Sequence, residues 1–78
     1  MVTDIHPAPV EFTEDQIRED HILRYFHYAH LPEKLRLRSQ PFCDLARTIV
    51  ETTPRNPERT VALRKLLEAK DAAIRAAL

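Results

Sequence analysis

A single cysteine, Cys43, stands in a chain of only 78 residues, so no intrachain disulfide can stabilise the fold. A chain of this size buries a limited core and is usually only marginally stable by itself. Well-packed helices, or association of several copies, are the remaining sources of stability. A lone cysteine is also more typical of a reducing, intracellular setting than of a secreted protein.

The sequence shows neither a membrane span nor an export signal. No apolar run approaches the roughly 20 residues that a membrane-spanning helix needs. The first residues, MVTDIHPAPVEFTEDQ, lack the basic stretch and the apolar stretch of a signal peptide. These features predict a soluble cytoplasmic protein.

The N-terminal third is expected to contain an irregular arm and a short helix. Residues 1–12 carry two prolines and little periodicity, which is typical of irregular chain. Thr13 and Gln16 form a capping box at the start of a helix predicted over residues 14–28. The HLP stretch that follows ends this helix, because a residue before proline avoids the α region.

A second helix is predicted from Pro32 to about Thr52, since proline fits the first turn of a helix. Pro41 lies inside its apolar pattern. Either the helix kinks at this proline, or a new helix restarts there with Ser39 or Gln40 as its cap. We favour a kinked or two-part helix.

A third helix is predicted from Pro57 to about Ala77, with Asn56 as its cap and Pro57 at its first position. Strand signals are absent, so the expected fold class is all-α: a helical hairpin over about residues 32–78, within one helical domain over residues 13–78.

The third helix carries two apolar stripes, which is more than one partner helix can cover. We therefore expect helix contacts between subunits of an oligomer. The stripes are Leu63, Leu67, Ile74 and Leu78, and Ala62, Leu66, Ala69, Ala73 and Ala76.

The net charge of zero conceals an uneven distribution. Residues 1–20 contain six acids and one base, whereas residues 21–78 contain eleven bases and six acids, an excess of +5. A mildly basic domain is compatible with an anionic partner, although the same charges can simply form solvated helix faces. Arginine outnumbers lysine nine to three, and arginine suits bidentate phosphate contacts and stacking on flat rings.

Catalytic and metal-binding patterns are not found in the sequence. His21, His27, His30 and Cys43 do not have the spacing of a known zinc site, and we expect no metal or other cofactor. The chain contains no glycine, which excludes a Walker loop and a GxGxxG turn. Cys43 lies on the apolar side of the second helix and is expected to be a buried structural thiol. No catalytic residue is assigned, and the protein is not expected to be an enzyme.

Two clusters could bind a phosphate-containing ligand. The start of the third helix offers unpaired N–H groups and a partial positive charge, flanked by Arg55, Arg59 and Thr60. The alternative is that Asn56 only caps this helix and the arginines are solvated. The second cluster, RYFHYAHLPEK over residues 24–34, mixes aromatic and basic residues, a combination that suits stacking on nucleobases.

Within the second cluster, Phe26 belongs to the predicted apolar stripe and is expected in the core. Tyr28 and His30 lie off that stripe and are the better ligand candidates. A helical protein this small has little room for a deep internal pocket. A shared site between subunits is therefore expected.

Two stretches of the chain resemble a known family. PRNPERTVALRKLLEAKDAAIRAAL (54–78) and YAHLPEKLRLRSQPFCDLARTIVE (28–51) resemble the two helices of a phage helical-hairpin family, the anti-CBASS and anti-Thoeris sponges. The resemblance extends over about residues 24–78. Its fairly specific core consists of Pro54, Glu58, Arg59, Ala62, Leu63, Lys65, Leu66, Glu68 and Ala69.

This resemblance implies a phage protein that sequesters cyclic nucleotide messengers of antiphage immunity without cleaving them, in the host cytoplasm. It implies a homohexamer with cyclic dinucleotides in pockets shared by two subunits and, as in some members of the family, cyclic trinucleotides in separate pockets near the oligomer axis. The sheet extension of the anti-Thoeris branch is missing, which favours the anti-CBASS type. The residues that the resemblance assigns to ligand binding are Tyr28, His30, Arg47, Asn56, Arg59, Thr60 and Lys65.

Two rival functions are a small helical nucleic-acid-binding module and a purely structural oligomeric phage protein. A module for polymeric nucleic acid should have a larger basic excess than +5, so DNA or RNA is not the expected partner. In the structural alternative the arginine cluster only caps helices and pairs with Glu58 or Glu51. From the sequence, Arg59→Ala and Tyr28→Ala are predicted to weaken ligand capture without unfolding the chain.

Overall fold

The computed structural model describes residues 12–78, and every regular element in this part of the chain is helical. The predicted all-α class is therefore confirmed. The predicted irregular arm lies outside the described residues except for Phe12, which is buried. The elements in chain order are α1 (Glu14–Glu19), the 3-10 helix η1 (His21–Phe26), α2 (Glu33–Thr52) and α3 (Pro57–Ala77).

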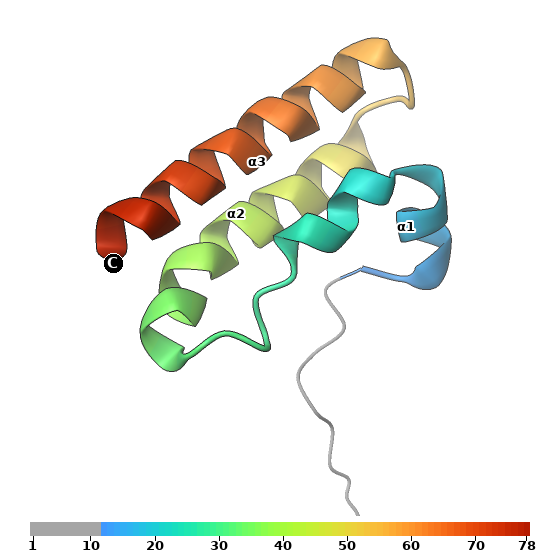
Figure 1. Cartoon of the computed structure of the whole chain (residues 1–78). Coiled ribbons are helices and arrows are strands. Elements are labelled where there is room, and N and C mark those ends of the chain that lie inside the picture. Colours follow the sequence, from blue (N-terminus) through green and yellow to red (C-terminus); the bar gives the residue numbers. More distant parts are fainter. Residues whose placement is uncertain (1–11) are drawn as a thin grey trace, which may run out of the picture.

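The two long helices form the frame of the molecule. α2 and α3 lie side by side and run in opposite directions, joined by residues 53–56 (Figure 1). η1 contacts both of them, and α1 contacts η1. η1 therefore packs onto the pair of long helices, and α1 packs onto η1.

The core lies where η1 meets the two long helices. Four of its seven buried apolar residues precede α2, so residues 12–28, which we call the N-terminal segment, supply more than half of these seven. Burial of apolar surface is the main favourable term in folding, and this segment is therefore an integral part of the fold. The seven residues are Phe12, Leu23, Phe26, Tyr28, Cys43, Ala46 and Leu63.

The predicted helix over residues 14–28 is wrong in its second half. The capping box is present: Gln16 N donates to Thr13 Oγ1 at 3.1 Å, and Thr13 N donates to Gln16 Oε1 at 2.9 Å. α1 nevertheless ends at Glu19, because Asp20 is extended, with φ −133° and ψ 90°. The chain then winds as a 3-10 helix, in which residues three apart share one face, and so both Leu23 and Phe26 reach the core.

α2 is one continuous helix, so the predicted restart at Ser39 or Gln40 is wrong. Ser39 is buried within the helix, and Pro41 lies inside it at an exposed position. Proline cannot donate to the carbonyl four residues earlier, here that of Leu37. A kink at Pro41 stays a prediction.

α3 begins and ends where the sequence predicts. Leu63 is buried, and Leu66 and Leu67 pack partly buried against the core. The alanine stripe behaves differently, because Ala62, Ala69 and Ala76 are exposed. The described residues leave these three alanines uncovered, whereas Leu66 of the same stripe packs against the core.

Candidate functional site

The chain turns from α2 into α3 without any residue in the left-handed conformation. No described residue has a positive φ, and Thr53 at the end of α2 is extended. Many helices end instead on a left-handed glycine that helps to satisfy the last carbonyls. In a chain without glycine, another group has to bond these carbonyls.

Arg59 is that group. Its Nη1 donates to the carbonyl of Val50 at 3.3 Å and to the carbonyl of Thr53 at 3.1 Å. Its Nη2 donates to Asp20 Oδ2 at 2.5 Å, and the whole residue is only 5% exposed. Arg59 therefore belongs to the structural framework of the connection, close to what the structural alternative expected, although its acidic partner is Asp20 rather than Glu58 or Glu51.

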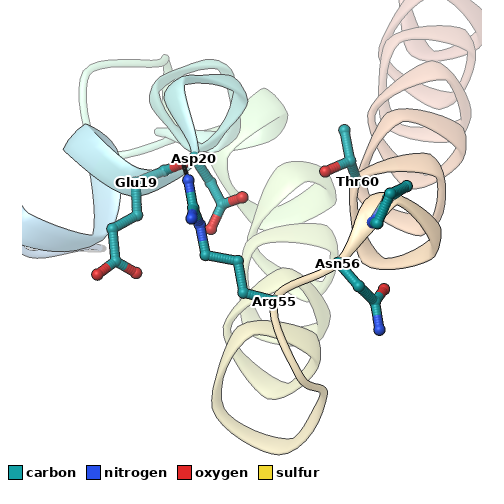
Figure 2. Close-up of a pocket in the computed structure, with 6 residues that line it drawn as sticks. Glu19, Asp20, Arg55, Asn56 and Thr60 are labelled. Carbon is teal, nitrogen blue, oxygen red and sulfur yellow. Dashed lines mark hydrogen bonds between the residues drawn. The ribbon is translucent and has the colours of Figure 1, made fainter.

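The start of α3 is capped as the sequence predicts. Asn56 Oδ1 accepts from Arg59 N at 2.9 Å, and Pro57 occupies the first turn, where its missing N–H costs nothing. The Thr60 side chain is on the exposed side of this turn. Figure 2 shows its hydroxyl directed toward Asp20, whereas the Asn56 amide lies at the outer edge of the turn.

An open hollow lies between this turn and the N-terminal segment. One part has a volume of about 290 Å³ and is lined by Glu19, Asp20, Arg55, Asn56, Pro57 and Thr60 (Figure 2). A neighbouring part, about 450 Å³, shares four of these residues. We call the two parts together the α3 hollow. The residues that only the second part adds are Arg18, His21, Ile22 and Arg64.

Arginines dominate the charge around the α3 hollow. Arg55 crosses from the α2–α3 connection toward α1, and its Nη2 donates to the carbonyl of Glu19 at 3.2 Å (Figure 2). Arg64 makes no ion pair with any residue of the described chain. The negative charge of Asp20 is matched by buried Arg59, which leaves exposed Glu19 as the main opposing charge.

The structure brings only part of the predicted site together. Asn56 and Thr60 line the α3 hollow, and Arg59 lies behind it through its pairing with Asp20. Tyr28 is 8% exposed within the core, so its ring does not face solvent. His30 is exposed in the connection before α2 and does not line the hollow.

The other two predicted residues also lie away from the α3 hollow. Arg47 pairs with Asp44 at 3.3 Å, and its guanidinium carbon is 5.6 Å from the centre of the Phe12 ring. Lys65 is exposed, with Nζ 3.9 Å from Glu68 Oε1. The basic residue of α3 that lines the hollow is Arg64, one position earlier.

A second cation of α3 is buried beneath η1. Lys70 donates from Nζ to the carbonyl of Tyr25 and is 8% exposed. Burial lowers the pKa of Lys70 below its ordinary value of 10.5, and nearby Asp71 and Cys43 oppose this shift. Lys70 lines neither part of the α3 hollow, so its contact with Tyr25 fixes η1 in place rather than serving a ligand.

Among residues 12–78 no three His, Cys, Asp or Glu side chains are grouped so that they could hold a metal ion. None of the helices in the same residues is long and apolar enough to cross a bilayer.

Comparisons with models of protein families, with characterised proteins and with solved structures found no match for this chain. The site is therefore interpreted from its own geometry.

Proposed function

We propose that the protein is a phage sponge that binds cyclic oligonucleotide messengers, namely cyclic dinucleotides and cyclic trinucleotides, and sequesters them without cleavage. Capture of these messengers in the host cytoplasm would block CBASS-type immunity. The observation that supports this proposal is the α3 hollow, where Arg55, Arg64 and the Thr60 hydroxyl surround the first turn of a 21-residue helix.

The chemistry of the α3 hollow suits a phosphodiester. A helix N-terminus carries a partial positive charge, and arginine forms charge-assisted bonds with phosphate oxygens. Cleavage would require a nucleophile activated by a base or a metal, and among the described residues no hydrogen bond joins the Thr60 hydroxyl to His21, the histidine of the lining. Binding without turnover is therefore the activity that this set of side chains supports best.

A base-stacking ring is available next to the α3 hollow. Ile22 lines the hollow, and in a 3-10 helix Tyr25 lies directly one turn further along the same face, about 6 Å away along the axis. The Tyr25 ring is 58% exposed, with Arg24 5.9 Å from its centre. We therefore assign stacking to Tyr25, in place of buried Tyr28.

The size and openness of the α3 hollow favour a site completed by another subunit. Its larger part, about 450 Å³, falls at the small end of typical ligand pockets, which measure about 300–1,000 Å³. A pocket that buries most of a ligand needs walls on several sides, and here one side is open. The hexamer that the family resemblance implies would supply the missing wall.

One observation favours the purely structural alternative. Asn56 and Arg59 are both engaged in capping the two long helices, which gives the turn a sufficient role without a ligand. In that case the arginines of the α3 hollow are only solvated surface charges.

Titration calorimetry of the purified protein against cyclic di- and trinucleotides, with a linear dinucleotide as control, distinguishes a sponge from a purely structural oligomer. Nanomolar binding of the cyclic ligands, with intact ligand released on heat denaturation, supports the sponge. Degraded ligand would instead indicate an enzyme. No heat of binding for any cyclic ligand would leave the structural oligomer as the better function, and a gel shift with duplex DNA would test the nucleic-acid alternative.

A further inference from the structure

The Asp20 carboxylate is buried and yet lines both parts of the α3 hollow. Its side chain is only 8% exposed, and its Oδ2 accepts a hydrogen bond from Arg59 Nη2 at 2.5 Å. Among residues 12–78 no other group donates to this carboxylate. An ionised carboxylate has about four lone-pair sites, so most of the acceptor capacity of Asp20 is unused.

The unused acceptor capacity of Asp20 faces the hollow. Figure 2 shows the carboxylate between Arg55 and the Thr60 hydroxyl, which belong to the same lining. The carboxylate of Glu19 points away from Thr60, on the other side of Arg55. Because Arg59 binds one oxygen of Asp20, the orientation of this carboxylate is fixed before any ligand arrives. Asp20 is therefore the acceptor that a ligand in the hollow meets.

We propose that Asp20 makes the α3 hollow selective for guanine, by accepting hydrogen bonds from the N1–H and the 2-amino group of the base. This assignment rests on the proposed binding of cyclic oligonucleotides and adds the base that they carry. Of the four common RNA bases, guanine alone has two adjacent donors on its pairing edge. Adenine and cytosine place a ring-nitrogen lone pair beside their amino group, and uracil places a carbonyl oxygen on each side of its N–H.

Burial makes this preference strong. An ionised carboxylate only accepts hydrogen bonds, so an acceptor atom of the ligand placed against it is repelled. A buried polar group that loses its donor also bears the cost of its desolvation. Sites that hydrogen-bond an N–H of their ligand therefore discriminate well against an analogue that lacks this group.

The other groups of the hollow fit the remainder of a guanine nucleotide. The O6 carbonyl of guanine lies next to N1–H on the same edge of the base. The Thr60 hydroxyl, which has no hydrogen-bond partner among the described residues, can donate to O6. Arg55 and Arg64 then remain for the phosphates, to which arginine forms charge-assisted bonds.

A series of ligands tests the assignment on the unchanged protein. Titration calorimetry compares cyclic di-GMP with cyclic di-IMP, in which hypoxanthine lacks only the 2-amino group, and with cyclic di-AMP. One hydrogen bond to a charged group contributes enough for the guanine ligand to bind about tenfold to a hundredfold more tightly than the hypoxanthine ligand. The adenine ligand should bind at least as weakly as the hypoxanthine ligand.

Equal affinity for the guanine and hypoxanthine ligands, or tighter binding of the adenine ligand, overturns the role of Asp20 and leaves the sponge proposal standing. No binding of any of the three overturns both proposals. The two failures are therefore distinguishable in one experiment.

Two variants locate the selectivity in the protein. Asp20→Asn keeps the shape of the side chain but replaces an acceptor with a donor, so the ratio of the guanine and hypoxanthine affinities should fall to about one. Thr60→Val should weaken both ligands, since both keep O6, and leave this ratio unchanged. Circular dichroism first establishes that Asp20→Asn is folded, because its ion pair with Arg59 is lost. A folded Asp20→Asn chain with the wild-type ratio overturns the assignment; if this variant does not fold, the ligand series alone decides.

Discussion

The guanidinium of Arg59 and the carboxylate of Asp20 lie 2.5 Å apart, with both side chains less than a tenth exposed. The pair joins the end of α1 to the beginning of α3, 39 positions away in the sequence. The same guanidinium bonds two carbonyls at the end of α2. One side chain thus ties three elements together, and its loss affects all of them.

Replacing Asp20 with alanine is expected to lower the free energy of unfolding by about 3–5 kcal/mol, because it leaves a buried guanidinium without its counter-charge. The matched control is Asp15→Ala, which removes an exposed pair with Arg18 at 2.8 Å. Exposed pairs contribute at most about 1 kcal/mol. Urea denaturation of both variants measures the difference, and equal losses would show that the buried pair has no special role.

Asn56→Ala removes the cap of α3. We expect a loss of about 1 kcal/mol, because the N–H of Arg59 no longer has its side-chain acceptor. Gln40→Ala, an exposed polar-to-alanine change within α2, should alter stability by less than about 0.5 kcal/mol. Thermal melts of the two variants decide the point; an Asn56→Ala chain as stable as wild type would mean that Pro57 alone fixes the helix start.

Lys70 gives the protein a dependence on alkaline pH. Its folded-state pKa is lowered below 10.5, so between that pKa and 10.5 the unfolded chain binds a proton that the folded chain lacks. The free energy of unfolding therefore rises with pH in this window. Lys70→Met removes the ionisable group and should not show this gain.

Urea denaturation of wild type and Lys70→Met at about pH 7.5 and about pH 10 isolates this contribution, since all other titrating groups cancel in the difference. The wild type should gain stability relative to the variant at the higher pH. A difference that is constant, or that shrinks, would contradict a desolvated amine at this position.

Substitutions at two neighbouring positions of α3 distinguish the α3 hollow from the ligand site that the family resemblance implies. Arg64 lines the α3 hollow and Lys65 does not. A charge-assisted hydrogen bond contributes about 1.5–3 kcal/mol, so Arg64→Ala should weaken cyclic dinucleotide binding by about tenfold to a hundredfold. Lys65→Ala should bind as wild type does. Calorimetry in which only the Lys65 variant loses affinity would favour the resemblance.

Tyr25→Ala tests the proposed stacking role. Stacking of a base on an aromatic ring contributes about 1–3 kcal/mol, so affinity should fall by about fivefold to a hundredfold. The exposed ring makes little contribution to the core, and the helical circular dichroism spectrum should be unchanged. Tyr28→Ala is unsuitable for this purpose, because a buried ring is expected to destabilise the fold when truncated. Undiminished affinity in Tyr25→Ala would remove this residue from the site.

Local signals in the sequence are sufficient to place most helix ends. Two local pairs mark helix starts, Thr13 with Gln16 and Asn56 with Pro57, because each pair interacts only with the first turn of the helix that follows it. Both predicted helix starts are confirmed. The second half of the N-terminal segment was not predictable in this way. With an α-helical period, Tyr25 would lie in the core and Tyr28 outside it. The chain instead winds as a 3-10 helix and becomes extended at His27, so Tyr25 is exposed and Tyr28 is buried.

The site was harder to predict than the fold, because its main contact is distant in sequence. Nothing near Arg59 indicates that Asp20 would reach it, and a helix start flanked by arginines looks the same whether it holds a ligand or a carboxylate of the same chain. The uneven charge distribution was the available signal. Among the described residues, Asp20 of the acidic part pairs with Arg59 of the basic part, as opposite charges favour.

The two buried cations of α3 also affect the free-energy cost of lifting the N-terminal segment from the long helices. Arg59 and Lys70 each bond one group of the N-terminal segment, the carboxylate of Asp20 and the carbonyl of Tyr25 respectively. When the segment lifts away, both cations regain hydration, which offsets part of the cost of exposing Leu23 and Phe26 to water. The segment should therefore undergo sub-global opening at a lower free energy than the pair of long helices, and its amides should exchange hydrogen faster than those of α2 and α3.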